Sequence, residues 1–143
     1  MKLVDTNVLL YAVDDTSPPH EVARAWLEQQ LSGTETIGFA WNALLGFVRL
    51  STSARVFSSP LAVGAALDRV EAWLAQPCAT VLAPTKRHAA VLRDLLAPLG
   101  TAGNLTSDAH LAALALEHGA VICSTDGDFA RFPGVDLVNP LQP

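Results

Sequence analysis

The 143-residue sequence contains little cysteine, with only Cys78 and Cys123 in the whole chain. These two residues show neither CxxC spacing nor a histidine-rich neighbouring segment, which disfavours both a structural zinc site and a disulfide framework. Long apolar runs are also missing, because no stretch reaches the roughly 18 residues that a membrane-spanning helix needs. The N-terminus, with one lysine and an early aspartate, does not resemble a signal peptide. We therefore expect a cytoplasmic protein with no membrane contact.

Positive charge is scarce as well. Nine lysines and arginines face 14 aspartates and glutamates, so the formal net charge is −5. A protein that coats duplex nucleic acid by neutralising its phosphates would be basic, so that role is disfavoured. An enzyme that holds nucleic acid through metal ions and a few arginines remains compatible with this charge. Arg49, Arg55 and Arg131 are the candidate phosphate contacts, and a solvated surface role is the alternative for each.

Half of the residues are apolar and 16% are charged, which is the composition of a chain with a packed core and not of a disordered one. The length is near that of one ordinary domain. No internal repeat, linker or low-complexity segment interrupts it. The sequence thus predicts a single domain over residues 1–143.

Apolar runs and helical spacing alternate along the chain. The predicted strands cover residues 3–5, 36–40, 80–82, 120–123 and 136–139. The predicted helices cover residues 8–13, 20–31, 41–50, 61–75, 86–96 and 107–118. Thr106 is expected to cap the last of these helices, and Gly119 to end it. Strands that alternate with helices predict an α/β fold with a mainly parallel sheet.

Four aspartates stand where a predicted strand ends or a predicted helix begins: Asp5, Asp108, Asp126 and Asp128. In an open α/β sheet such positions converge on one crevice. Carboxylates gathered there repel one another unless a divalent cation neutralises them. Without histidine or cysteine ligands, oxygen donors favour Mg²⁺ or Mn²⁺. Taken singly, each aspartate has an ordinary alternative as a helix cap, a turn residue or a partner of the helix dipole.

The histidines give weaker signals. His110 lies two residues after Asp108, and residues with that spacing do not share a helical face. His118 is expected to interact with the dipole at a helix C-terminus, and His20 and His88 are expected on the surface. The tryptophans fall on apolar helical faces, which favours the core or a subunit interface over base stacking: Trp26, Trp41 and Trp73.

Three segments carry a resemblance to a known family. They are VDTNVLL at 4–10, NLTSDAHLAALA at 104–115, and STDGDF at 124–129 with RFPG at 131–134. In this order they resemble PIN-domain ribonucleases, and the whole chain is similar to the VapC toxin branch of bacterial toxin–antitoxin pairs. The resemblance implies a three-layer α/β/α fold around a mainly parallel sheet. It also implies an endoribonuclease dependent on Mg²⁺ or Mn²⁺, an antitoxin partner, an RNA substrate and a homodimer.

The resemblance also implies roles for individual residues. By motif position, Asp5, Asp108 and Asp126 match the family's catalytic, metal-binding acids, and Asp128 is a further candidate metal ligand. Three neighbouring polar residues would orient the carboxylates or metal-bound water: Thr6, Asn7 and Thr125.

The chain departs from the family at one point. The family commonly has a glutamate on the helix after the second strand, but no acidic residue lies between Glu35 and Asp68 here. The aspartates and water could suffice, metal affinity could be weaker, or an RNA phosphate could complete the coordination. A catalytically weakened PIN-fold protein that acts through antitoxin or RNA binding is therefore the alternative function. A phosphatase of the haloacid-dehalogenase type is disfavoured, because it needs an aspartate where Asn7 stands.

Overall fold

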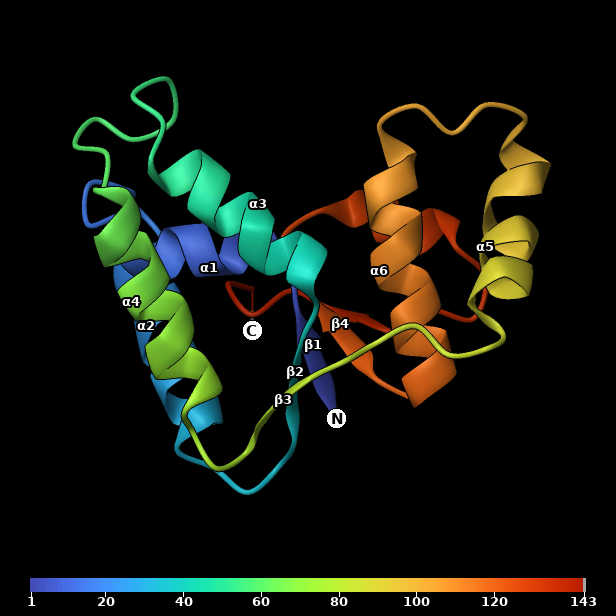
Figure 1. The fold of residues 1–143 in the computed structure, drawn as a ribbon, viewed down its shortest axis with the longest axis horizontal. Coiled ribbons are helices and arrows are strands. Elements are labelled where there is room, and N and C mark those ends of the chain that lie inside the picture. Colours follow the sequence, from blue (N-terminus) through green and yellow to red (C-terminus); the bar gives the residue numbers. More distant parts are fainter. Residues whose placement is uncertain (143) are drawn as a thin grey trace.

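The computed structural model describes residues 1–142 and contains one five-stranded sheet (Figure 1). All pairings are parallel, in the spatial order β3-β2-β1-β4-β5. The strands are β1 (Lys2–Val4), β2 (Ile37–Phe39), β3 (Ala79–Val81), β4 (Val121–Cys123) and β5 (Leu137–Val138). β1 lies in the centre, where Lys2 pairs with Ile37 on one side and with Val121 on the other. The parallel sheet confirms the predicted α/β class.

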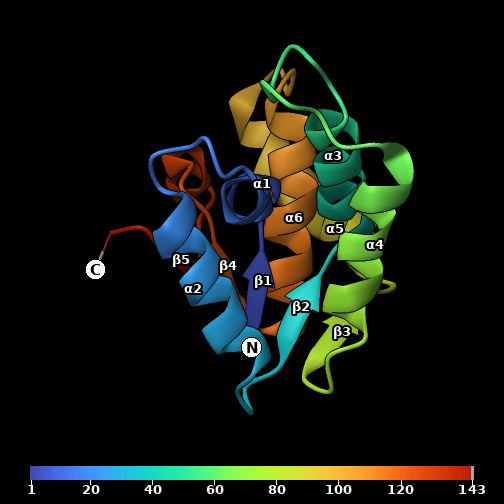
Figure 2. The ribbon, with the colours of Figure 1, turned by 90° about the vertical axis from the view of Figure 1, so that its left-hand side faces the viewer.

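Helices connect the strands and cover both faces of the sheet (Figures 1 and 2). They are α1 (Thr6–Val13), α2 (His20–Leu31), α3 (Trp41–Ser51), α4 (Val63–Leu74), α5 (His88–Leu96) and α6 (Leu105–His118), with short 3₁₀ helices η1 (Ala97–Leu99) and η2 (Gly127–Arg131). α5 and α6 lie on one side of the sheet, and α1, α2 and α4 on the other. This arrangement confirms the three-layer fold. No helix within residues 1–142 is long and apolar enough to cross a membrane.

The core forms on both faces of β1 because successive side chains of a strand point to opposite sides. Leu3 packs into the cluster that includes Ile122 and Leu114 of α6. Val4 packs into the other cluster, with Phe39 and Leu9. A strand buried on both faces is held firmly in place, so the residue that follows it, Asp5, has a well-defined position.

Three local expectations were wrong. α6 begins at Leu105 rather than 107, because the chain winds earlier: the Leu105 N–H donates to Ala102 O at 2.8 Å. Thr106 therefore lies inside the helix and caps nothing; its hydroxyl donates to Gly103 O. His88 and His20 are not surface residues, because their side chains are only 13% and 15% exposed. The expected end of α6 is confirmed, with Gly119 in the left-handed conformation at φ 68°.

Candidate functional site

Asp5 comes directly after β1 and caps the helix that follows it. Its Oδ1 accepts a 2.8 Å hydrogen bond from the Thr6 N–H, which makes it the N-cap of α1. Its Oδ2 accepts from the Ser124 hydroxyl at 2.7 Å and from the Asn7 amide at 3.3 Å. Capping uses one carboxylate oxygen, and the other faces the end of β4.

The other three aspartates converge as expected. One carboxylate oxygen each of Asp108, Asp126 and Asp128 lies within 4.8 Å of the others. Asp108 comes from the first turn of α6, while Asp126 follows β4 and caps η2 by accepting from the Asp128 N–H at 2.8 Å. Oxygens this close together can share one divalent ion.

The electrostatics link Asp5 to this trio. Burial raises the pKa of Asp108 to about 6, helped by the charges of Asp126, Asp5 and Asp128. The pKa of Asp5 is also raised: burial outweighs the hydrogen bonds from Ser124 and Thr6, and the Asp126 charge adds to it. The four carboxylates therefore repel one another, and a divalent cation would relieve that repulsion.

One of the three candidate arginines lies beside the cluster. The Arg131 Nε is 3.6 Å from Asp128 Oδ1, with both side chains about half exposed. Arg49 and Arg55 are exposed near the far end of α3. Arg49 is seven residues from Asn42, the α3 residue that contacts α6, which is about 10 Å along the helix axis. The structure thus brings only Arg131 to the carboxylates.

The residues that support the carboxylates include one that the sequence analysis did not single out. Ser124, 1% exposed, accepts hydrogen bonds from the Asn7 amide and the Asp126 N–H, both at 3.0 Å, while donating to Asp5. Asn7 also accepts from the Thr125 N–H at 3.3 Å. The Thr6 hydroxyl instead donates to a backbone carbonyl of α3. Ser124 could have been predicted from its position, because it is a small polar residue that directly follows a buried central strand.

Asn42 is a second residue that the sequence analysis missed. It is the second residue of α3, and its amide donates to both the carbonyl and the hydroxyl of Ser107 at 3.3 Å. Ser107 precedes Asp108. The Asn42 Oδ1 is buried and has no hydrogen-bond partner within residues 1–142. Four hard carboxylates, two with raised pKa values, and an unpaired amide oxygen nearby fit an oxygen-seeking divalent ion.

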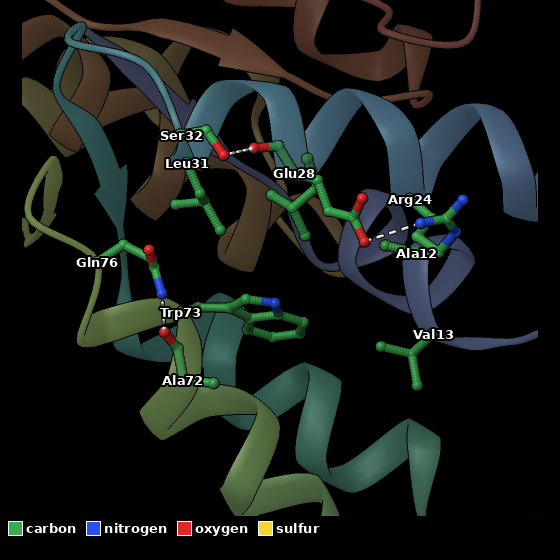
Figure 3. A pocket seen from close by; sticks show the side chains of 10 residues that line it. Ala12, Val13, Arg24, Glu28, Leu31, Ser32, Ala72, Trp73 and Gln76 are labelled. Carbon is green, nitrogen blue, oxygen red and sulfur yellow. Dashed lines mark hydrogen bonds and ion pairs between the residues drawn. The ribbon is translucent and has the colours of Figure 1, made fainter.

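Away from the carboxylates, a hollow of ≈ 240 Å³ lies between α1, α2 and α4, and none of the four aspartates lines it (Figure 3). Leu27, Leu31 and Trp73 give it apolar walls. Arg24 and Glu28 lie at its edge and form a 2.8 Å ion pair. An apolar groove with a charged border has the composition of a protein-binding surface.

Comparison with known proteins gives consistent results. Residues 2–135 match the family model described as PIN domain. The chain is 53% identical to "Ribonuclease VapC37" of Mycobacterium tuberculosis, over 98% of this chain and 97% of the relative. It is 43% identical to "Ribonuclease VapC33" of the same species, over 99% of both.

Two solved structures share the fold. VapBC2 from Rickettsia felis, bound to a DNA fragment from the promoter, has a TM-score of 0.70 and 17% identity, and the match covers 96% of this chain and 97% of that one. FitAcB from Neisseria gonorrhoeae has a TM-score of 0.65 and 22% identity, with full coverage of both chains.

Proposed function

We propose that this chain, which belongs to the PIN domain family, is an endoribonuclease and the toxin of a toxin–antitoxin pair. Its reaction is the hydrolysis of RNA phosphodiesters with Mg²⁺ or Mn²⁺. The observation that carries the proposal is the trio of oxygens from Asp108, Asp126 and Asp128 within 4.8 Å. The trio lies at the carboxyl end of the central strands, where α/β enzymes bind ligands. The ribonuclease names of the relatives support the same reaction.

The proposed catalytic residues are Asp5, Asp108 and Asp126, with Asp128 as a further metal ligand. A divalent ion held by them would lower the pKa of bound water and stabilise the charge that develops on the phosphate. Ser124 and Asn7 keep one oxygen of Asp5 in place through hydrogen bonds. Arg131, beside Asp128, would contact the RNA backbone.

The groove between α1, α2 and α4 is the proposed docking site for the antitoxin. Its walls of Leu27, Leu31 and Trp73 suit an apolar segment of a partner, and the solved neighbours named VapBC and FitAB support such a partner. A homodimer would use a different surface. Trp41 and Leu45, one turn apart on α3, are 49% and 59% exposed, and burial of both would favour association.

The second candidate function is a binding protein with weakened catalysis. It is favoured by Asn42, which provides a neutral oxygen on the helix where the family commonly has an acid. Calorimetry with MnCl₂, with and without RNA, separates the two functions. Binding of Mn²⁺ supports the nuclease, and the absence of binding in both conditions supports the binding protein.

The central experiment is inducible expression with mapping of cleavage sites in total RNA. Asp5→Asn is expected to abolish cleavage and growth arrest while circular dichroism and melting temperature show an intact fold. Asp68→Asn, at an exposed position on α4, is the matched control and should cleave normally. Undiminished cleavage by well-folded Asp5→Asn protein would contradict the proposal.

A further inference from the structure

A second group of titratable side chains joins α5 to α6, two helices that lie side by side (Figure 1). His88, the first residue of α5, has its Nε2 2.9 Å from the Nδ1 of His110 on α6. The other ring nitrogen of His88 contacts the carboxylate of Glu117, two turns further along α6. None of these residues forms a hydrogen bond or ion pair with the four aspartates within residues 1–142, so the group is distinct from the proposed nuclease site.

Glu117 is held in one orientation. Its side chain is fully buried, with 0% exposed, and its Oε1 accepts from both the N–H and the hydroxyl of Thr85. Burial raises the pKa of Glu117, but the hydrogen bonds from Thr85 and His88 outweigh this and lower it. Glu117 is therefore a carboxylate at neutral pH, and it orients His88 by accepting from Nδ1–H.

A carboxylate on the outer nitrogen is the usual arrangement of a metal-binding histidine, because it fixes the tautomer and directs the other nitrogen toward the ion. Here Glu117 directs the Nε2 of His88 toward His110. The two rings are inclined by 76°, with centroids 4.8 Å apart, so they meet edge to face rather than in a stack. Two imidazole nitrogens from different helices thus face each other across a hydrogen bond.

We propose that His88 and His110 form a second metal site, which takes a borderline divalent ion such as Zn²⁺ with water as the remaining ligand. Imidazole suits zinc, whereas Mg²⁺ prefers oxygen, so the two sites of the chain select different ions. Two nitrogens on one tetrahedral zinc, at about 2.0–2.1 Å from the metal, are about 3.3 Å apart. The observed 2.9 Å separation needs to open by a few tenths of an ångström, and the His110 proton moves from Nδ1 to its other ring nitrogen so that both facing nitrogens offer a lone pair.

The packing of α5 allows this small movement. Although Leu95, Val91 and Leu92 pack further along the helix, Ala89 and Ala90 in its first turn are exposed, so that turn can shift slightly. An ion bound between His88 and His110 would then cross-link α5 to α6. Zinc should accordingly stabilise the folded chain, since it binds the native arrangement and not the unfolded one.

The test is titration of the full chain with ZnCl₂ alone, by calorimetry and by thermal unfolding. An Asp108→Asn/Asp126→Asn background removes zinc binding by the carboxylates. One zinc per chain and a raised melting temperature are expected to persist in this background. Glu117→Gln should weaken zinc binding by roughly 10–100-fold, as is usual for loss of such an outer partner.

His110→Asn is the decisive variant, because an asparagine amide can still donate a hydrogen bond to the His88 Nε2 but is a poor zinc ligand. It should fold normally by circular dichroism and lose zinc binding at least tenfold. His118→Asn, on the same helix but bonded to the Ala83 carbonyl, is the matched control and should bind zinc like its parent. The proposal is overturned if the background protein binds no zinc, or if His110→Asn binds it unchanged.

Discussion

The hydroxyl of Ser124 donates a 2.7 Å hydrogen bond to Oδ2 of Asp5, across the ends of the neighbouring strands β4 and β1. The same hydroxyl oxygen accepts from Asn7 and from the backbone of Asp126. Ser124 thus connects Asp5 to the segment that carries the other carboxylates. The site depends on this buried serine although it is not itself an expected metal ligand.

Ser124→Ala should therefore destabilise the protein near neutral pH. Its hydrogen bond lowers the pKa of Asp5 and partly offsets the effect of burial, so its loss raises that pKa further. The free energy of unfolding should fall by about 1.5–3 kcal/mol, the usual cost of losing a hydrogen bond to a charged group. Urea unfolding at pH 7 measures this. Ser32→Ala, which removes an exposed hydroxyl bonded to Glu28 O, is the control, and equal losses in both variants would contradict the prediction.

Asp108 should make the metal-free protein less stable as the pH rises. Its folded-state pKa of about 6 exceeds the ordinary value of 3.8, so the folded chain holds the proton more tightly than the unfolded chain. The stability that protonated Asp108 contributes is then lost between about pH 4 and pH 6, and it is absent at higher pH. Asp108→Asn should stabilise the protein by about 1 kcal/mol at pH 7, a figure reduced for solvent screening.

Urea unfolding in EDTA at pH 5 and at pH 7.5 tests this prediction for Asp108. The Asp108→Asn variant should show a weaker dependence on pH than the parent chain, whereas the exposed control Asp68→Asn should not. An unchanged slope in Asp108→Asn would show that this carboxylate does not have a raised pKa.

Gly46 should be intolerant of a side chain. A Cβ atom there would lie 2.9 Å from the Thr6 hydroxyl, which donates to Ala43 O and joins α1 to α3. Gly46→Ala should cost about 1–3 kcal/mol through overpacking. Gly64→Ala on α4 meets nothing within 4 Å and should instead stabilise by about 0.5–1 kcal/mol. Thermal unfolding of the two variants should give shifts of opposite sign.

Asn42→Asp should strengthen binding of Mn²⁺. The new carboxylate would lie beside Ser107, next to Asp108, and would add negative charge to the helix that lacks an acid. We expect affinity to rise on the order of tenfold, with lower stability in EDTA because of added repulsion. Calorimetry and melting curves measure the two effects. Gln29→Glu, at an exposed position on α2, adds the same charge elsewhere. An equal gain in Mn²⁺ affinity in that variant would argue against a local effect.

Local patterns in the sequence predicted most of the fold. The apolar run ending at Cys123 is buried on both faces, and an unbroken apolar run of this kind predicts a central strand. The convergence of Asp5 and Asp126 followed from the rule that parallel strands end at the same edge. The first conclusion depends on residues that are neighbours in the sequence, and the second depends on one topological rule.

Contacts between distant residues were not predictable in this way. His88 was expected on the surface because nothing near it in the sequence suggests burial, yet Glu117 lies 29 residues away and removes it from solvent. Asn42 meets Ser107 across 65 residues. The partner of a polar side chain is set by how helices pack, and a single sequence does not specify that packing.

The position of β1 has a consequence for synthesis of the chain. Residues 2–4 are made first, but one of the two neighbours of β1 is β4, whose residues 121–123 are made near the end. A ribosome that has not passed residue 124 has produced Asp5 without the hydroxyl of Ser124 that donates to it and without Asp126, whose charge acts on it in the finished protein. A nascent chain that ends before Asp126 therefore lacks part of the proposed metal site.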